Sequence, residues 1–182
     1  MAEAYRIKDQ QALYFCTITT IDWIDIFTRK IYKDIVVDSL NYCIKHKGLE
    51  VYAFVIMSNH LHLIISSNKE PISAIIRDFK KFTAKQIIHT IQTEPESRKE
   101  WLLAKMAYAG NRNSNNTTYQ LWQQDYHAIE ISSDHFLHQK TNYIHQNPVR
   151  AGIVEHEEDY FYSSARYFYN KKCLVKLSFI GG

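Results

Sequence analysis

Two histidines stand two residues apart in an apolar segment. The segment Ala53 to Ser67 reads AFVIMSNHLHLIISS, and His60 and His62 flank Leu61 within it. Alternate side chains of a strand share a face, so the two imidazoles lie together while Leu61 points the other way. Two such imidazoles suit a divalent metal ion, which usually needs at least a third ligand. The alternative is a pair of half-buried histidines that hydrogen-bond to their neighbours, and this short pattern does not decide between the two.

A tyrosine and an asparagine four residues apart form the second candidate group. They are Tyr143 and Asn147 in the segment TNYIHQNPVRAGIV, residues 141–154. On a helix, side chains at this spacing lie one turn apart on the same face. A phenol can act as a nucleophile, and an amide oxygen is a hard metal ligand. Two observations favour a plainer role: Phe136 shares the face, so Tyr143 could simply pack, and Pro148 disfavours helical geometry at Asn147.

Hydrophobic periodicity indicates the elements that position these residues. We expect strands at residues 12–19, 51–56, 60–66 and 126–131 and helices at 29–46, from Pro71 to beyond Ile87, at 97–108 and at 134–145. Gly48 is predicted to cap the first helix, and Pro148 is predicted to stop the last one.

This order of elements predicts an α+β fold: a ferredoxin-like antiparallel sheet with helices packed on one face, plus a helical and loop insertion. The insertion covers about residues 94–118, and the polar stretch 110–118 within it is expected to be a mobile loop. Because we find no internal repeat or linker, the prediction is a single domain, residues 1–182.

Composition and charge restrict the class of protein. The 182 residues are 46% hydrophobic and 23% charged, which is typical of a globular domain rather than of a disordered chain. The net charge of +3 permits a nucleic-acid partner without requiring one. The three cysteines are widely spaced and fit neither a disulfide framework nor a thiolate metal site. With no apolar run of membrane-spanning length and a polar start, we expect no membrane association and a cytoplasmic location.

The two candidate groups together resemble a known family. MSNHLHLII followed about 80 residues later by YIHQNPVRAGIV resembles the single-tyrosine HUH transposases, in particular the REP-associated tyrosine transposases. In that family U is the hydrophobic residue between the histidines, here Leu61. The resemblance extends to LWQQDYHAIEI before the tyrosine segment and DYFYSSARYF after it, so it spans about residues 13–168.

This resemblance implies a metal-dependent endonuclease and strand transferase that acts on single-stranded DNA, often beside a hairpin. It implies that His60, His62 and Asn147 are metal ligands and that Tyr143 is the nucleophile, which forms a 5′-phosphotyrosine intermediate. The position of Asn147 is glutamine in some relatives. The cofactor implied is a divalent ion, Mg²⁺ or Mn²⁺.

A DNA-binding protein also needs a cationic surface. Arg77, Lys81 and Lys85 recur every four residues with Lys80 beside them, and Arg150 follows the tyrosine segment. The hypothesis is that these five side chains contact backbone phosphates. An ordinary solvated helix face is the alternative for the first four. Trp101 and Trp122 are suited to stacking on unpaired bases, with core packing as the alternative for each.

Two other functions fit the same residues. One is a catalytically silent module that binds nucleic-acid hairpins on the same fold, and the other is an unrelated metal-dependent hydrolase in which Tyr143 only packs. A covalent protein–DNA adduct separates the transposase from both. The partner is expected to be single-stranded or hairpin DNA. The sequence leaves open whether the protein is a monomer or a homodimer.

Overall fold

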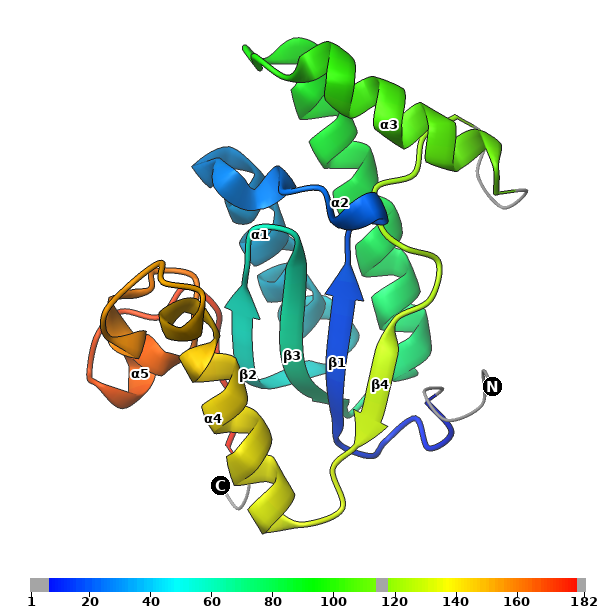
Figure 1. The fold of residues 1–182 in the computed structure, drawn as a ribbon. Helices are drawn as coiled ribbons and strands as arrows, with labels where there is room; N and C mark the ends of the chain where they lie inside the picture. Colours follow the sequence, from blue (N-terminus) through cyan, green and yellow to red (C-terminus); the bar gives the residue numbers. More distant parts are fainter. Residues whose placement is uncertain (1–6, 114–117, 180–182) are drawn as a thin grey trace.

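A four-stranded antiparallel sheet with the strand order β2-β3-β1-β4 organises the chain in a computed structural model that describes residues 7–113 and 118–179 (Figure 1). The strands are β1 (Tyr14–Thr19), β2 (Leu49–Ile56), β3 (His60–Ser67) and β4 (His127–Glu130). The helices are α1 (Lys30–Lys47), α2 (Ile72–Thr93), α3 (Lys99–Asn111), α4 (Asp134–Arg150) and α5 (Ala165–Phe168), with 3₁₀ turns η1 (Ile21–Trp23), η2 (Ile26–Thr28) and η3 (Glu157–Asp159). This order confirms the predicted ferredoxin-like α+β fold.

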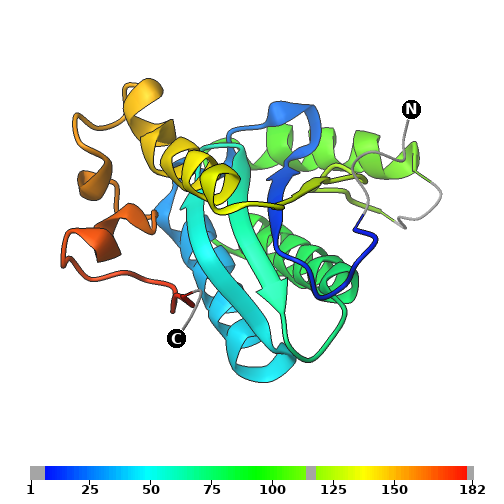
Figure 2. The ribbon, with the colours of Figure 1, turned by 90° about the horizontal axis from the view of Figure 1, so that it is seen from below.

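The helices are divided between the two faces of the sheet. Figure 2 shows α1 and α2 on one face and α4 against the other. The pair α1 and α2 follows the prediction of helices packed on one face, and α4 adds a layer on the opposite side. Leu61 of β3 points into the core on the side of α1 and α2. His60 and His62 lie on the other side of β3, so they face α4.

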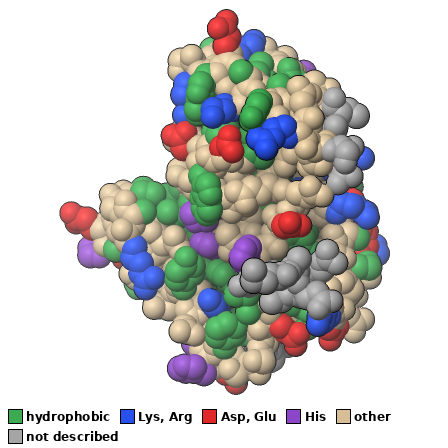
Figure 3. All heavy atoms as spheres, turned by 45° about the vertical axis from the view of Figure 1, so that its right-hand side comes forward, with side chains coloured by type: hydrophobic (Ala, Val, Ile, Leu, Met, Phe, Trp, Pro, Cys, Tyr) green, Lys and Arg blue, Asp and Glu red, His purple; other side chains and the backbone are tan. Residues whose placement is uncertain are grey.

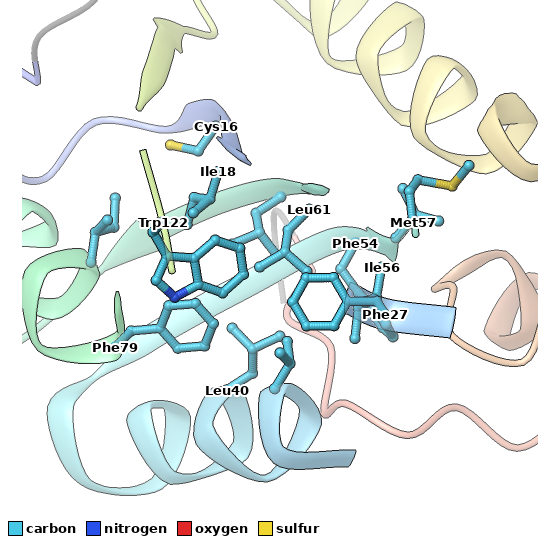
Figure 4. Close-up of a cluster of buried hydrophobic side chains, with 14 of the residues drawn as sticks. Cys16, Ile18, Phe27, Leu40, Phe54, Ile56, Met57, Leu61, Phe79 and Trp122 are labelled. Atoms are coloured by element: carbon cyan, nitrogen blue, oxygen red, sulfur yellow. The ribbon is translucent and has the colours of Figure 1, made fainter. Parts of the chain in front are cut away.

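The main core lies between the sheet and the α1–α2 layer. In Figure 4, Leu61 of β3 meets Leu40 of α1 together with Phe27, Phe79 and Trp122. The Phe27 and Trp122 rings stack with centroids 5.5 Å apart, and Trp122 Nε1 donates to Thr83 Oγ1 at 2.9 Å. Trp122 is only 4% exposed, so the structure selects core packing for this residue over base stacking.

The predicted cap of α1 is confirmed. Gly48 follows the helix with φ +76°, a conformation that glycine adopts without steric cost, and its N–H donates to Cys43 O. A Cβ at this position would lie 2.5 Å from Cβ of Lys69. The glycine is therefore required both by its backbone angle and by the close approach of the chain that follows β3.

The prediction that Pro148 stops α4 is wrong. The helix continues through Pro148 and ends at Arg150, and Gly152 follows it with φ +68°. Gly152 N donates to Val149 O and Ile153 N donates to Pro148 O, the arrangement of a helix end closed by a left-handed residue. Pro148 lacks one backbone donor, but it is buried and lies in the last turn of the helix, where few hydrogen bonds follow it.

The segment after α4 covers the edge of the sheet and fastens the helix to it. Ser163 forms a bridge with Val55 of β2, and Ser164 N donates to Phe54 O at 2.9 Å. The hydroxyl of Ser164 accepts from Phe54 N at 2.9 Å and lies 2.9 Å from Nε2 of His145 on α4. A buried chain of hydrogen bonds thus runs from β2 through Ser164 to α4.

The insertion contains α3, which packs against α2 through buried Leu102 and Met106. Residues 114–117 of the polar loop predicted at 110–118 lie outside the described residues. Among the helices that the structure describes, none has the length and apolar character needed to cross a membrane.

The buried His145 makes stability depend on pH. Burial lowers the pKa of His145 to about 4, below its ordinary value of 6.5, so the unfolded chain binds the proton more tightly. The free energy of unfolding should fall as the pH drops from 6.5 toward 4, by up to about 3 kcal/mol from this residue, and level off below. Urea unfolding at several pH values should show a smaller pH dependence in His145→Asn than in the wild type.

The exposed His138 of the same helix supplies the control, and His138→Asn should keep the wild-type pH dependence. An unchanged pH dependence in His145→Asn would contradict the assignment of the buried proton-sensitive group to His145.

Candidate active site

The two histidines lie side by side at the start of β3, as the sequence predicts. Their ring centroids are 4.6 Å apart with the planes at 70°. The register pairs His60 with Thr19 and His62 with Thr17 of β1, so all four side chains share the face toward α4. In Figure 3, histidine side chains gather near the centre of the surface shown. The strand pairing thus confirms that the two imidazoles share one face.

In both imidazole rings, Nδ1 is the nitrogen that makes a hydrogen bond within the protein. Nδ1 of His60 lies 2.6 Å from Oδ1 of Asn59, and Nδ1 of His62 lies 2.9 Å from Oγ1 of Thr17. The amide orientation of Asn59 is fixed because its Nδ2 donates to Trp23 O at 3.2 Å, which leaves only an acceptor for His60. Nδ1 of His60 therefore carries the proton, and Nε2 of that ring keeps its lone pair.

Burial keeps both histidines neutral at neutral pH. His62 is 5% exposed and stacks on Phe15 with centroids 5.3 Å apart. Burial, together with the nearby His60 and Lys140, lowers the pKa of His62 to about 3, and burial lowers the pKa of His60. Neutral imidazoles whose Nδ1 atoms are held by hydrogen bonds are the usual form of metal-ligating histidine.

Tyr143 lies on α4 directly over the histidine face. Its ring is edge-on to His62 with centroids 5.2 Å apart and edge-on to Phe15 at 6.0 Å. The side chain is 36% exposed, so the residue combines one packed side with access to solvent. The structure therefore brings the predicted nucleophile to the predicted metal ligands, and the packing against Phe15 that the sequence allowed is also present.

Asn147 follows Tyr143 by one turn on the same stripe of α4. Its Nδ2 donates to Tyr143 O at 3.3 Å, so Oδ1 is the atom of this side chain that can accept a hydrogen bond or bind a cation. Among the described residues no group of three or more histidine, cysteine, aspartate or glutamate side chains is placed to hold a metal ion. A metal site at the two histidines would therefore need a third ligand of another type, such as an amide oxygen.

Two cations flank Tyr143 on α4. Lys140 Nζ lies 5.7 Å and Arg150 Cζ 5.7 Å from the centroid of the Tyr143 ring. With Asn147 these residues follow the spacing three, four, three along one helix face. Arg150 was predicted from the sequence as a DNA contact, and the structure places it at the site. Lys140 was missed, although its position three residues before Tyr143 signals the shared face.

Other residues at the site were also missed. Thr17 orients His62 across the sheet, Asn59 orients His60, and His127 of β4 lies in register with Thr17 on the same face. These contacts follow from strand pairing and from the turn between β2 and β3. Hydrophobic periodicity alone does not show which residues are opposed across strands.

The predicted cationic residues of α2 lie on the opposite side of the sheet from this site (Figure 2). Arg77, Lys81 and Lys85 are exposed there, and Arg77 donates to Oδ1 of Asp78 at 3.0 Å. Lys80 differs, because Nζ donates to the carbonyls of Gln123 and Gln124 at 2.8 Å each and burial lowers its pKa to about 8. A phosphate contact by Lys80 would require it to leave these carbonyls.

Comparison with known proteins identifies the class. A family model described as "Transposase IS200 like" matches residues 10–110, more than half of the chain, and the match includes His60 and His62 but ends before Tyr143. The chain therefore belongs to the IS200-like transposase family. A search among curated proteins found no match.

The fold is similar to that of a solved structure. The structure of a REP-associated tyrosine transposase bound to a REP hairpin matches with a TM-score of 0.64 and 16% identity, covering 100% of this chain and 94% of that one. A transposase candidate from Deinococcus radiodurans matches with 18% identity and a TM-score of 0.45, covering 76% of this chain and 92% of that one. The first match supports the fold, and the second is too weak to support an inference.

The hydroxyl of Thr17 can donate to Nδ1 of His62 or accept from it, and a metal ligand role of Nε2 requires that Nδ1 be the protonated atom. Nitrogen-15 NMR of the metal-free protein at pH 7 should show the proton on Nδ1 of His62, with Nε2 unprotonated. Thr17→Val removes the acceptor and should raise the population of the Nε2–H form. Thr93→Val, an exposed change at the end of α2, serves as the control and should leave the spectrum of His62 unchanged. A wild-type ring protonated mainly at Nε2 would mean that Thr17 donates to Nδ1 and would contradict Nε2 as a metal-ligand atom.

Proposed function

We propose that the protein cuts and rejoins single-stranded DNA beside hairpins, with Tyr143 as the nucleophile. The observation that carries this proposal is the placement of a half-exposed tyrosine over two neutral histidines, 5.2 Å from the nearer ring, in a chain of the IS200-like transposase family. The solved structure of similar fold contains a REP hairpin, which supports hairpin DNA as the partner.

The chemistry is a transesterification at one phosphodiester. The phenol oxygen of Tyr143 attacks the phosphorus, the bond to the 3′-oxygen breaks, and the phenol proton passes to solvent while the leaving 3′-oxygen takes up a proton. The products are a 5′-phosphotyrosine and a free 3′-hydroxyl. Attack by another 3′-hydroxyl reverses the step and joins two strands, so no external energy source is needed. Lys140 and Arg150 supply positive charge where the phosphate must lie.

The donor set fits a divalent metal ion. His60 and His62 would hold Mg²⁺ or Mn²⁺ through Nε2, and Asn147 through Oδ1. A bound ion of this kind polarises a phosphoryl oxygen and neutralises charge that develops in the transition state. Thr17 and Asn59 keep the two rings oriented toward that position, because each occupies the Nδ1 atom of its histidine.

The ligand assignment predicts the response of metal binding to substitution. His60→Ala and His62→Ala should each abolish Mn²⁺ binding in calorimetry, whereas Asn147→Ala should weaken it less because water can replace one ligand. His60→Ala is the cleaner test, since His62 is 5% exposed and its removal leaves a cavity. His156→Ala, on the exposed segment before η3, is the control. Wild-type Mn²⁺ affinity in the two histidine variants would exclude this metal site.

The nucleophile assignment predicts a selective loss of chemistry. Tyr143→Phe removes one partly exposed oxygen, so stability should change by about 1 kcal/mol or less. Hairpin and Mn²⁺ binding should persist, while strand cleavage on a denaturing gel should disappear. Tyr42→Phe, an exposed tyrosine of α1, should cleave like the wild type. Continued cleavage by Tyr143→Phe would point to water as the nucleophile and hence to the hydrolase alternative.

The two cationic groups predict separate contributions to DNA binding. Lys140→Gln/Arg150→Gln should weaken hairpin binding at the site. Arg77→Gln/Lys81→Gln/Lys85→Gln should also weaken it and should lower the salt dependence by about one phosphate contact for each side chain that binds. Fluorescence anisotropy at several salt concentrations measures both effects. If the α2 variant keeps its affinity and salt dependence, those three residues form an ordinary solvated face.

A further inference from the structure

The exposed side of α3 alternates cationic and aromatic side chains. Arg98, at the N-terminal cap, is followed by Trp101, Lys105, Tyr108 and Arg112 at intervals of three, four, three and four residues, which places them on one helix face. Trp101 is 47% exposed and Tyr108 is 60% exposed. The buried face of the same helix is formed by Leu102 and Met106, so the two aromatic rings are not needed for packing against α2.

The cationic side chains of α3 contact its aromatic rings, and two of them also form ion pairs with aspartates. Arg112 Nη1 donates to the Tyr108 hydroxyl at 3.2 Å, and its Cζ lies 5.4 Å from the ring centroid. Arg98 Cζ lies 6.0 Å from the Trp101 ring. Acidic side chains from the segment of η1 and η2 pair with Arg98 and Lys105. Most of the affinity of this surface for an anionic chain would therefore come from stacking and from Arg112.

Trp23 lies between this helix face and the histidines. It is 58% exposed, and its ring is edge-on to His60 with centroids 6.1 Å apart. Trp23 has φ +55° and Asp22 before it has φ +47°, two successive left-handed residues that are not glycine. Such backbone conformations cost free energy and are found where a side chain must be held in a particular place.

Contacts connect Trp23 with the α3 surface. Asp22 Oδ2 lies 3.7 Å from Nζ of Lys105, and Asp25 Oδ1 lies 2.7 Å from Nη1 of Arg98. In Figure 3, basic and hydrophobic side chains are interspersed in the upper part of the molecule, where Figure 1 places α3, and histidines lie below them. One continuous surface thus leads from His60 over Trp23 to α3.

We infer that Trp23 and the α3 surface, formed by Trp101, Lys105, Tyr108 and Arg112, bind the single strand that continues from the scissile phosphate. This inference rests on the proposed function, because it takes Tyr143 and the histidines as the point of cleavage. Bases stack on exposed aromatic rings only when they are unpaired, which favours a single strand over a duplex. From Trp101 to Arg112 the helix is about 17 Å long, enough for a few nucleotides.

The test uses a fluorescent DNA hairpin with single-stranded tails of zero, four, eight or twelve nucleotides on either side. Anisotropy gives the affinity of the wild type, of Trp23→Ala and of Trp101→Ala/Tyr108→Ala. The matched control is Tyr42→Ala/Phe179→Ala, which removes two aromatic rings of similar exposure elsewhere. Circular dichroism verifies that each variant is folded, and a denaturing gel records covalent adducts in the same samples.

The expected result is that the wild type gains affinity as one tail lengthens, and that Trp101→Ala/Tyr108→Ala loses about tenfold or more of this gain. Trp23→Ala should lose part of the gain at the shortest tail, and the control should match the wild type. A gain equal to that of the wild type in both α3 and Trp23 variants would overturn the inference. The inference also fails if the α3 variant changes only self-association in sedimentation, because the surface would then bind a second copy.

The adduct readout separates this inference from the proposed function. If the wild type forms no adduct but the tail-dependent gain is lost in the α3 variant, the strand path stands and the Tyr143 chemistry fails. If the wild type forms the adduct and the α3 variant keeps the full gain, the chemistry stands and the strand path fails.

Discussion

The hydroxyl of Ser164 connects the sheet, which carries His60 and His62, with α4, which carries Tyr143. It accepts from Phe54 N of β2 and bonds to His145 of α4, both at 2.9 Å, in a buried position. Because His145 and Tyr143 belong to the same helix, this hydrogen bond helps to hold α4 against the sheet. The helix could otherwise slide over the polar face of β1 and β3, where Thr17, His60 and His62 offer less apolar surface than the opposite face. The segment after α4 therefore supports the candidate site through the position of this helix.

On the sheet, hydrogen bonds and burial act together on the histidines. Asn59 fixes the proton of His60, and Thr17 occupies Nδ1 of His62, while the surrounding apolar side chains keep both rings neutral. The cost of burying polar rings is offset by these hydrogen bonds, which also direct both Nε2 atoms away from the strand.

The sequence predicted the features of the site that depend on a single helix or strand. It did not predict the features that depend on how two such elements pack against each other. The shared face of His60 and His62, the cap at Gly48 and the shared face of Tyr143 and Asn147 follow from the periodicity of single strands and helices. Pro148 was misread because a helix tolerates proline near its end when packing favours it, and the true stop signal was Gly152. The position of the α2 cations across the sheet, the partner of Lys80 and the role of Thr17 required the packing of one element against another.

The central claim is that the phenol oxygen of Tyr143 becomes covalently linked to DNA at the histidine site. The most direct test is mass spectrometry of peptides from the wild-type protein trapped on hairpin DNA with Mn²⁺. The account predicts a 5′-linked nucleotide on the peptide that contains Tyr143. A nucleotide attached to any of the other 12 tyrosines, or cleaved DNA with no modified peptide, would contradict it.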